Sequence, residues 1–236
     1  MNTVLILSGG VGSRVNSDIP KQYIDINGHM MISRCIEAVL KCSHIDCIHI
    51  TAAKDWQEAI KADAKELIGD DFLRRFRGFS VPGENRQLSI YNGLKDIASY
   101  SSDDDIVIVH DAARPLVSEK LLTECIEACE EHDGVMPALP MKDTVYMSEN
   151  GKTISSLLER SKIYAGQAPE AFRLGMYLRA IEALLPEKIL KINGSSEPAI
   201  MYGMDIAIIK GDEGNFKITT DNDLKRYKDL IEKQRN

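Results

Sequence analysis

The stretch LILSGGVGSRVNSDIPKQ, residues 5–22, decides the fold, because an apolar run ends there in a glycine-rich turn. The apolar residues 4–7 predict a short strand buried in a parallel sheet. The glycines allow the backbone to turn sharply and to present N–H groups, and backbone dipoles together with cations bind polyanions. The glycines are Gly9, Gly10 and Gly12, and the cations are Arg14 and Lys21. We therefore expect a phosphate-binding loop after the first strand.

Two familiar phosphate motifs do not match this loop. The dinucleotide fingerprint G-x-G-x-x-G has Val15 where its third glycine belongs. The P-loop ends in Gly-Lys-Ser/Thr at a fixed spacing, which this loop lacks. Pro20 disfavours a helix directly after the glycines, because the residue before a proline avoids the helical region. An extended cationic loop is expected; the alternative, an ordinary glycine turn, leaves Arg14 and Lys21 unexplained.

Composition indicates a soluble enzyme. The 236 residues, 44% hydrophobic and 28% charged, are enough for one globular domain over residues 1–236. No apolar run is long enough to span a bilayer and no signal-peptide pattern opens the chain, so we expect a cytoplasmic protein without membrane contact. The net charge of −7 disfavours a nucleic-acid partner. The five cysteines contain no C-x-x-C pair and are expected to be core thiols.

Strand-like and helix-like segments alternate along most of the chain. Strands are expected at residues 4–7, 47–52, 79–81, 106–109, 134–138 and 205–210, and helices at 31–40, 56–68, 87–97, 119–131 and 174–185, with a closing helix capped by Thr220 or Asp221. This alternation predicts an α/β, Rossmann-like fold, with a mostly parallel wound sheet and helices on both faces. Ligands bind such sheets at the carboxyl ends of strands, where Gly10 and Asp111 fall.

The alternation breaks at residues 141–165. Residues 142–147 and 153–158 predict two strands, and Asn150-Gly151 between them is a strong hairpin signal. A hairpin inserted into a wound sheet has little core of its own. We therefore expect an inserted β-hairpin arm whose apolar residues pack on a second subunit, giving a homodimer.

Six patches together resemble one family, the cytidylyltransferases that act on polyol phosphates. They are the glycine loop with Arg14 and Lys21, and residues 82–89 (PGENRQLS), 110–115 (HDAARP), 142–144 (KDT), 167–169 (QAP) and 217–220 (KITT). The patches occur in order over nearly the whole chain. The resemblance implies that CTP and a polyol phosphate are the substrates and that Mg²⁺ or another divalent cation is required.

The resemblance also implies a role for individual residues. Residues implied to bind CTP are Ser8, Gly9, Gly10, Gly12, Gly83, Ser89 and Ala112, with Gly83 and Ser89 at the cytosine. Arg14, Lys21 and Lys217 are implied to act catalytically on the phosphates, Asp111 to hold the metal ion, and Arg114, Thr144 and Arg160 to bind the acceptor phosphate. By itself, Asp111 also fits a helix cap or turn, and Arg160 a solvated surface charge. Lys217, in an apolar strand-like run, needs an anionic partner, whereas His110 is expected to be structural.

Two segments depart from the family pattern. Residues 167–170 read Gln-Ala-Pro-Glu where many relatives carry Gln-Thr-Pro-Gln, and residues 194–198 read Gly-Ser-Ser-Glu-Pro where they carry Thr-Asp-Asp or Thr-Asp-Glu. By the resemblance, both segments are expected to lie where the acceptor side of the site is completed. The leading expectation is CMP transfer to 2-C-methyl-D-erythritol 4-phosphate, for isoprenoid precursors. The alternatives are ribitol 5-phosphate or another capsule or teichoic-acid polyol phosphate, a sugar-nucleotide pyrophosphorylase, and a nucleotide-binding module without turnover.

Overall fold

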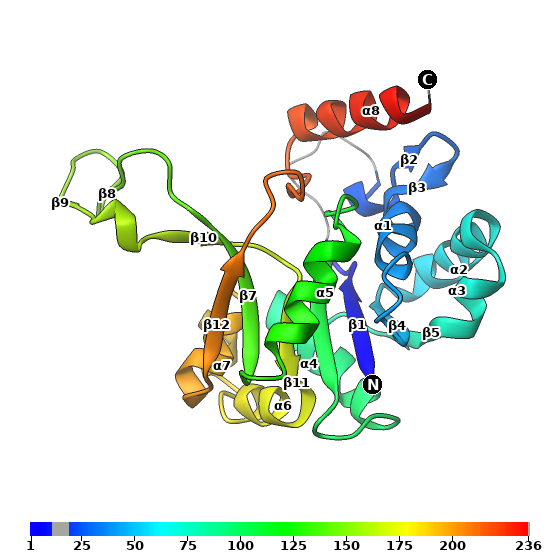
Figure 1. The fold of residues 1–236 in the computed structure, drawn as a ribbon, viewed down its shortest axis with the longest axis horizontal. Coiled ribbons are helices and arrows are strands. Elements are labelled where there is room, and N and C mark those ends of the chain that lie inside the picture. Colours follow the sequence, from blue (N-terminus) through cyan, green and yellow to red (C-terminus); the bar gives the residue numbers. More distant parts are fainter. Residues whose placement is uncertain (11–18, 236) are drawn as a thin grey trace.

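The structure is a computed structural model that describes residues 1–10 and 19–235, and its centre is an eight-stranded sheet with helices on both faces (Figure 1). The strands follow the order β10-β7-β11-β6-β1-β4-β5, and β12 pairs with β7. Their bounds are β1 Asn2–Leu7, β4 Cys47–Thr51, β5 Phe76–Ser80, β6 Ile106–Asp111, β7 Gly134–Pro140, β10 Tyr164–Gly166, β11 Glu170–Arg173 and β12 Ile206–Lys210. The wound, mostly parallel sheet predicted from the alternation is confirmed.

Two antiparallel strands make the sheet mixed. β11 lies between β6 and β7 and runs antiparallel to both, and β10 is antiparallel to β7. Neither strand was predicted, because each is short and the two are separated only by residues 167–169.

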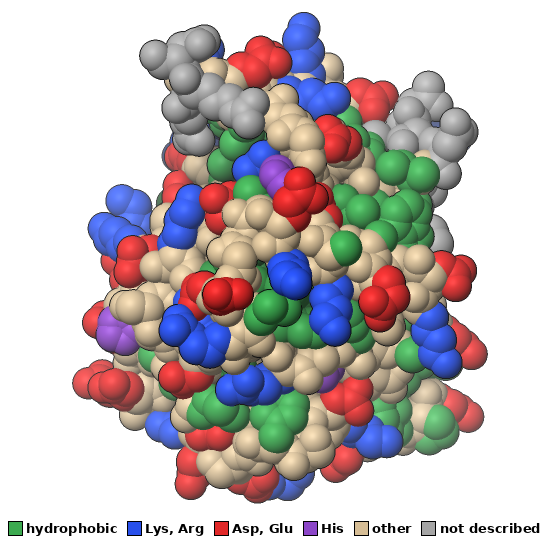
Figure 2. All heavy atoms as spheres, turned by 90° about the vertical axis from the view of Figure 1, so that its right-hand side faces the viewer, with side chains coloured by type: hydrophobic (Ala, Val, Ile, Leu, Met, Phe, Trp, Pro, Cys, Tyr) green, Lys and Arg blue, Asp and Glu red, His purple; other side chains and the backbone are tan. Residues whose placement is uncertain are grey.

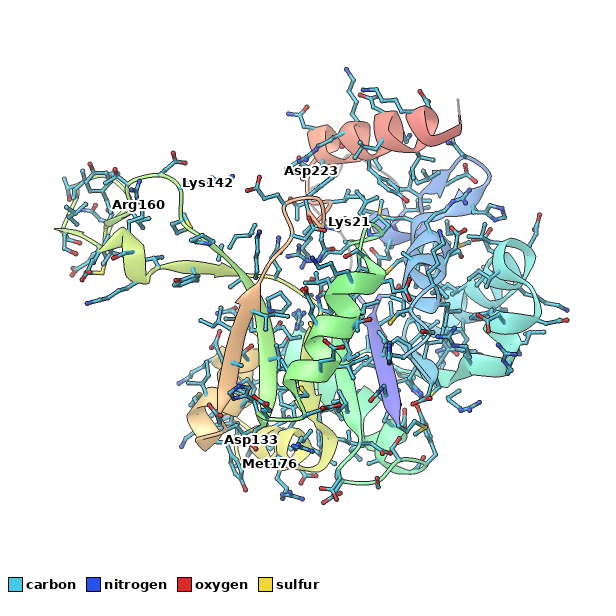
Figure 3. The ribbon with its side chains drawn as sticks, viewed as in Figure 1. Lys21, Asp133, Lys142, Arg160, Met176 and Asp223 are labelled. Carbon is cyan, nitrogen blue, oxygen red and sulfur yellow. The ribbon has the colours of Figure 1, made fainter. Side chains whose placement is uncertain are left out.

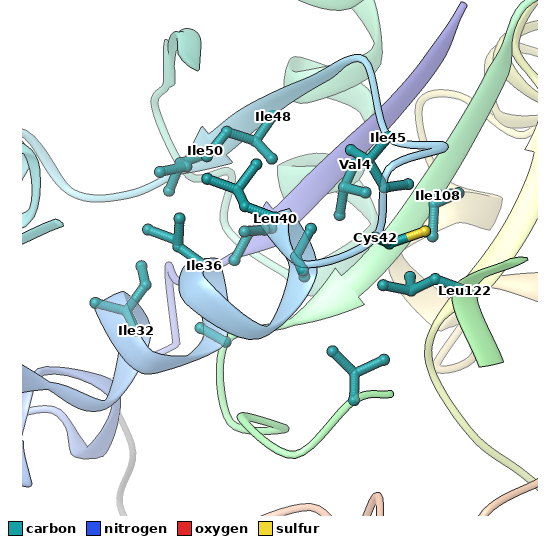
Figure 4. Packing of buried hydrophobic residues seen from close by; sticks show 14 of the residues in the cluster. Val4, Ile32, Ile36, Leu40, Cys42, Ile45, Ile48, Ile50, Ile108 and Leu122 are labelled. Carbon is teal, nitrogen blue, oxygen red and sulfur yellow. The ribbon is translucent and has the colours of Figure 1, made fainter. Parts of the chain in front are cut away.

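Helices pack on the sheet through alternating residues of the strands. Val4 and Ile6 of β1 contact one core cluster, which contains residues of α1, α2 and α5, while Leu5 faces a second cluster with α4, α6 and α7. Figure 4 shows the first cluster, in which α1 lies across β1 and β4. The helix bounds are α1 Met31–Leu40, α2 Lys54–Ile68, α3 Asp70–Arg75, α4 Arg86–Ala98, α5 Glu119–Ala128, α6 Leu174–Glu182, α7 Ser196–Tyr202 and α8 Asp221–Arg235. The short helices α3 and α7 were not predicted.

The register brings the ends of four parallel strands into one row. Leu7 at the end of β1 pairs with Thr51 on one side and with Asp111 on the other, and Thr51 pairs with Ser80. The glycine turn, the segment after β5 and Asp111 therefore emerge at the same edge of the sheet, as expected for a ligand site in a parallel α/β fold.

The arm projects from this body (Figure 1). Its strands β8 (Tyr146–Met147) and β9 (Ser156–Leu157) are antiparallel, so a hairpin is present, but each strand has only two residues, far shorter than predicted. The connection is a longer loop over residues 148–155 rather than a tight Asn-Gly turn. Within this loop the Asn150 side chain accepts hydrogen bonds from the N–H groups of Lys152 and Thr153. The predicted hairpin is therefore present, but its strands are short and side-chain hydrogen bonds hold the loop between them.

The C-terminal segment differs from its prediction in one respect. Residues 216–220 form no strand; they lead directly into α8, which lies beyond the carboxyl end of β1 (Figure 1). The predicted cap is confirmed for Thr220, whose hydroxyl accepts a hydrogen bond from the N–H of Asp223 at 3.2 Å. Tyr227 of α8 packs with Ile26, Met31 and Ile218 in a small apolar cluster. Ile26 belongs to β2 (Asp25–Ile26), which forms a short hairpin with β3 (His29–Met30).

The described surface is mixed in character. On the face viewed in Figure 2, acidic and basic side chains are interspersed. Among the residues that the structure describes, no helix is long and apolar enough to cross a membrane. All five cysteines are buried and free, as predicted.

Candidate active site

A pocket of about 460 Å³ opens at the row of strand ends. Its lining residues are Leu7, Ser8, Gly9, Gly10, Lys21, Gln22, Gly83, Glu84, Asn85, Arg86, Ser89, Asp111, Ala112, Ala113 and Lys217. The pocket therefore combines the start of the glycine loop, the segment after β5, the end of β6 and the segment before α8. Gly12 and Arg14, which were predicted to complete the loop, lie outside the described residues.

The start of the glycine loop is held in place by a polar anchor from the short helix η1 (Lys21–Tyr23). The amide of Gln22 donates to the carbonyls of Ser8 and Gly10, at 2.8 and 2.7 Å, and the Tyr23 hydroxyl donates to the Ser8 carbonyl at 2.8 Å. Gly9 is required sterically, because a Cβ there would lie 2.6 Å from the Cβ of Pro82. The turn and the segment after β5 are thus packed directly against each other.

The segment after β5 is tied to the first turn of α4. The N–H of Gly83 donates to the Ser89 hydroxyl at 3.0 Å, and Asn85 caps the helix by accepting from the N–H of Leu88 at 2.8 Å. A Cβ on Gly83 would lie 2.3 Å from the Cβ of Leu88. The structure therefore brings together the two residues predicted to lie at the cytosine.

Asp111, at the end of β6, is the electrostatic centre of the pocket. Its Oδ1 accepts from Arg86 at 2.9 Å, its Oδ2 pairs with Lys217 at 2.8 Å, and Arg114 Nε lies 3.8 Å from Oδ2. Burial raises the pKa of Asp111, but the cations oppose this effect and hold the pKa well below its usual range. The carboxylate is therefore ionised at neutral pH and neutralises part of a strongly cationic pocket.

Lys217 is placed by its neighbours rather than by a strand. Arg114 donates to the Asn215 carbonyl at 2.6 Å, and the N–H of Ile218 donates to the Ala113 carbonyl at 2.8 Å. The prediction of a strand-like run around Lys217 was wrong, because the backbone there bonds with the turn after β6 instead of with a strand of the sheet. The expected anionic partner of Lys217 is nevertheless present, and it is Asp111.

His110 lies beneath the pocket. It is fully buried, and its Nε2 lies 3.0 Å from the Arg114 carbonyl. Burial lowers the pKa of His110 to about 4, so the ring is neutral at physiological pH. These contacts agree with the structural role expected for this histidine, since its ring supports the turn that carries Arg114.

The two predicted arm residues do not lie with the pocket of their own chain. Arg160 donates to the Lys142 carbonyl at 2.7 Å, and Figure 3 shows both residues on the arm, far from Lys21. Thr144 is an exposed arm residue. Within one chain, only Arg114 of the three predicted acceptor residues reaches the Asp111 cluster.

The sequence interpretation gave no role to Arg86 or Gln22. Arg86 lies inside the patch PGENRQLS, residues 82–89, at the start of a predicted helix. That position, next to the residues implied to bind CTP, is the sequence feature that could have indicated a role in the pocket. Gln22 is the residue directly after Lys21, but its function depends on two loop carbonyls that sequence spacing does not reveal.

A histidine, a serine and an aspartate also meet outside the pocket, without forming a nucleophilic triad. His49 Nε2 lies 2.8 Å from the Ser80 hydroxyl, and that hydroxyl donates to Asp96. Ser80 is only 1% exposed, so no substrate reaches its oxygen. In a catalytic triad the carboxylate bonds the other ring nitrogen, which here faces Tyr100. The group is a buried polar network that supports the segment after β5.

Comparison with protein families gives one match over nearly the whole chain. The family model described as "IspD: 2-C-methyl-D-erythritol 4-phosphate cytidylyltransferase" matches residues 2–233.

Curated relatives carry two different names. The chain is 28% identical to the ribitol-5-phosphate cytidylyltransferase of Streptococcus agalactiae serotype V, over 100% of this chain and 97% of that protein. It is 30% identical to the 2-C-methyl-D-erythritol 4-phosphate cytidylyltransferase of Geobacter metallireducens, over 93% of each. It is 35% identical to the bifunctional enzyme IspD/IspF of Wolbachia pipientis, over 97% of this chain and 55% of that protein.

Solved structures share the fold. The 2-C-methyl-D-erythritol 4-phosphate cytidylyltransferase of Francisella tularensis superposes with a TM-score of 0.78 at 25% identity, covering 96% of this chain and 97% of that one. The 4-diphosphocytidyl-2C-methyl-D-erythritol synthase of Anaerococcus prevotii gives a TM-score of 0.80 at 24% identity, covering 98% and 96%. The match includes the antiparallel as well as the parallel part of the chain, since coverage is almost complete.

Proposed function

Since the chain belongs to the 2-C-methyl-D-erythritol 4-phosphate cytidylyltransferase (IspD) family, and is thus a CTP-dependent nucleotidyltransferase, we propose that it transfers CMP to a polyol phosphate. The products are a CDP-polyol and pyrophosphate. One observation carries the proposal: Asp111 lies among Arg86, Lys217 and Arg114, in a pocket that the glycine turn and the Gly83–Ser89 contact also line.

CTP is proposed to lie across this pocket with its base against α4. Gly83 and Ser89 lie at one side of the pocket, and small residues there leave backbone groups free to reach the polar edge of cytosine. Ser8, Gly9 and Gly10 begin the loop proposed to wrap the triphosphate, and Ala112 lies beside them in the pocket lining. Lys21 and Lys217 supply the charge that phosphates need.

The Asp111 carboxylate fits a magnesium ligand. Among residues 1–10 and 19–235, no three His, Cys, Asp or Glu side chains cluster tightly enough to hold a metal ion by themselves. One ionised carboxylate is sufficient when phosphate oxygens and water complete the shell, as Mg²⁺ prefers. A divalent ion held there would supply positive charge between the phosphate oxygens. Arg86 and Lys217 each contact one oxygen of Asp111, and a carboxylate offers about four lone-pair sites, so lone pairs remain that would bind the ion.

The proposed chemistry requires no activated side-chain nucleophile. The acceptor phosphate is already ionised near neutral pH, and its oxygen attacks the α-phosphorus of CTP while the bond to the bridging oxygen breaks and pyrophosphate leaves. Catalysis then consists of holding two anions in line and stabilising the charge that develops on the phosphoryl oxygens. Lys21 and Lys217 are proposed for this role, together with Arg14.

The leading proposed acceptor is 2-C-methyl-D-erythritol 4-phosphate, supported by the family description and by relatives of that name at 30% identity. That assignment would place the enzyme in isoprenoid precursor synthesis. Ribitol 5-phosphate is the second candidate, because relatives of that name match over the entire chain. Both acceptors are polyol chains ending in a phosphate monoester, which Arg114 is proposed to bind, with Thr144 and Arg160 contributed by the arm of a second copy.

A pyrophosphate-release assay tests the proposal. The purified chain is supplied with CTP, Mg²⁺ and either polyol phosphate, and release is expected only when all three are present. Release with UTP or GTP and a hexose 1-phosphate would instead indicate a sugar-nucleotide pyrophosphorylase. CTP binding without release over a broad panel of acceptors would indicate a binding module. The ratio of kcat/KM for the two polyol phosphates identifies the acceptor.

A further inference from the structure

The two segments that depart from the family pattern contact each other. Glu170 opens β11, and Ser196 opens α7, 26 residues later. The Ser196 hydroxyl donates to Oε2 of Glu170, and both side chains are buried, at 6% and 8% exposure. An ionisable side chain is rarely buried unless it has polar partners. The carboxylate at position 170 and the hydroxyls at 195–196 therefore form one local arrangement rather than two unrelated substitutions.

This arrangement reaches the pocket through Arg86. One terminal nitrogen of Arg86 donates to the Ser195 hydroxyl at 2.5 Å, and the other donates to Asp111 at 2.9 Å. Glu170 accepts from Ser196, the neighbour of Ser195, and its charge attracts Arg86. Arg86 thus lies between two carboxylates: Asp111 bonds it directly, and Glu170 attracts it across the loop that carries Ser195. Its side chain remains 28% exposed and lines the pocket.

The loop that carries Ser195 is fixed from several sides. Gln87 donates to the Gly194 carbonyl at 2.6 Å, and the Tyr177 hydroxyl donates to the Ser195 carbonyl at 2.8 Å. Glu197 accepts from the N–H groups of Gly194 and Asn193, at 2.7 and 3.2 Å. Ser195 is only 1% exposed, so its hydroxyl is not presented to a ligand. The ligand-facing group at this wall of the pocket is the guanidinium of Arg86.

In-line displacement defines which substrate approaches this wall. The leaving pyrophosphate lies toward the glycine turn and Lys21, because that loop is proposed to hold the triphosphate. The attacking phosphate must enter from the opposite side of the α-phosphorus. Arg86 contacts Asp111 from α4 and lines the pocket, so its guanidinium is available to an incoming anion.

We propose that Glu170 and Ser195 are positioning residues for acceptor binding, which fix the Arg86 guanidinium so that its remaining donors face the acceptor phosphate. A guanidinium has five N–H donors, and the bonds to Ser195 and Asp111 use two of them. Without the hydrogen bond to Ser195, the guanidinium is free to rotate. Bidentate recognition of a phosphate depends on a guanidinium with a fixed orientation. The inference rests on the proposed transfer to a polyol phosphate.

Three variants test the inference: Ser195→Ala, Glu170→Gln and the double variant. Ser195→Ala removes the hydrogen bond to Arg86 but keeps the Glu170 carboxylate. Glu170→Gln removes the charge but keeps a group that accepts a hydrogen bond from Ser196. In each single variant the KM for the acceptor is expected to rise about tenfold, because a hydrogen bond to a charged group is lost or weakened. The Kd for CTP, measured without acceptor, is expected to stay within about twofold, because the groups at the base and glycine turn are untouched.

The double variant separates positioning from general damage. Glu170 and Ser195 act through the same guanidinium, so their effects on the acceptor KM are not expected to multiply. The acceptor KM of the double variant is expected to match that of the single variant with the higher KM. Ser118→Ala is the matched control: it removes the half-buried hydroxyl that caps α5, which accepts from the N–H of Leu121 at 3.2 Å, without contacting the Arg86 network. It is expected to lower the melting temperature and leave the acceptor KM unchanged.

The outcomes distinguish this inference from the proposed function. If the wild-type chain releases no pyrophosphate with any polyol phosphate, the proposed function fails and the inference fails with it. If the wild type is active and both single variants keep its acceptor KM, the positioning role is wrong while the function stands. A fall in kcat with both KM values unchanged, or equal losses for CTP and acceptor, would assign these residues to stability alone.

Discussion

Asp111 illustrates how one carboxylate organises a pocket for anions. Three cations surround it, and each would repel the others if the carboxylate were absent. In the proposed site, phosphates would offer the same cations additional partners, and the cluster is arranged before the substrate binds. Such preorganised charge is effective because little reorganisation is needed during the reaction.

Lys21 lines the same pocket and allows this arrangement to be tested. Lys21→Ala is expected to lower kcat about a hundredfold or more, because a positive charge next to the developing charge on the phosphates is lost. The measurement is steady-state pyrophosphate release at saturating CTP and acceptor. Lys41→Ala, an exposed lysine of the same charge beyond the end of α1, is the control and should keep the wild-type rate. A near-normal rate for the Lys21 variant would remove this loop from the catalytic site.

Single residues could be found from sequence only where a recognisable pattern surrounds them. Asp111 and Lys217 belong to compact patches, and the structure brings them within 2.8 Å of each other. Arg86 was given no role, and Glu170 was noted only as a departure from the family pattern, because their contacts are with residues far along the chain, Ser195 and Ser196. Sequence proximity carries no information on such contacts.

At the scale of elements, the alternation of strands and helices predicted most of the parallel sheet because each unit has a local apolar pattern. β11 has four residues, and its pairing with β6 and β7 is long-range. The segment 216–220 has the composition of a strand, but its backbone bonds with the turn after β6. Short segments of this kind are defined by tertiary contacts, which is why the sequence misassigned them.

The start of α8 depends on one carboxylate. Oδ2 of Asp223 accepts from the N–H groups and hydroxyls of Thr219 and Thr220, each at 2.9 Å. Asp223→Ala is expected to lower the free energy of unfolding by about 1–2 kcal/mol, the range for a lost helix cap. Urea unfolding at pH 7 measures it. Asp229→Ala, an exposed residue of the same helix, provides the same change of charge and should leave the free energy nearly unchanged.

The arm exposes large apolar side chains. Ile154 and Leu157 are 66% and 64% exposed, although apolar side chains of this size gain from burial. The wild type is expected to sediment as a dimer at micromolar concentration, and the double variant Ile154→Asp/Leu157→Asp as a monomer. Ile208→Asp, on β12 and 54% exposed, is the control outside the arm and should remain dimeric. A monomeric wild type would refute the role of the arm.

For the whole molecule, buried histidines link stability to pH. His49 is 3% exposed and faces Ser80, Tyr100 and Asp96. Burial lowers the pKa of His49 below its ordinary value, although Asp96 opposes this effect, and burial lowers the pKa of His110 to about 4. Both rings are therefore neutral in the folded chain at a pH where the unfolded chain already binds protons.

The sign of the effect follows from this difference. Because the unfolded histidines titrate near pH 6.5, their contribution to stability is fully present above that pH and is lost as the pH falls below it. Glu170 acts in the opposite direction: burial raises the pKa of its carboxyl, so its contribution is present at low pH and is lost as the pH rises. The difference between the wild type and a histidine variant, measured from pH 7.5 to 5.5, therefore isolates the histidine contribution.

Urea unfolding over this range is expected to show a free energy of unfolding that decreases toward pH 5.5. The slope approaches about 1.4 kcal/mol per pH unit for each histidine that is protonated only in the unfolded state. His49→Gln keeps a donor and an acceptor in the network with Ser80 and Tyr100 but does not titrate, so its curve should be flatter than that of the wild type. His44→Gln, an exposed histidine, is the control and should keep the wild-type slope. A free energy that stays constant or rises toward pH 5.5 would show that the rings are protonated in the folded chain, contrary to their burial.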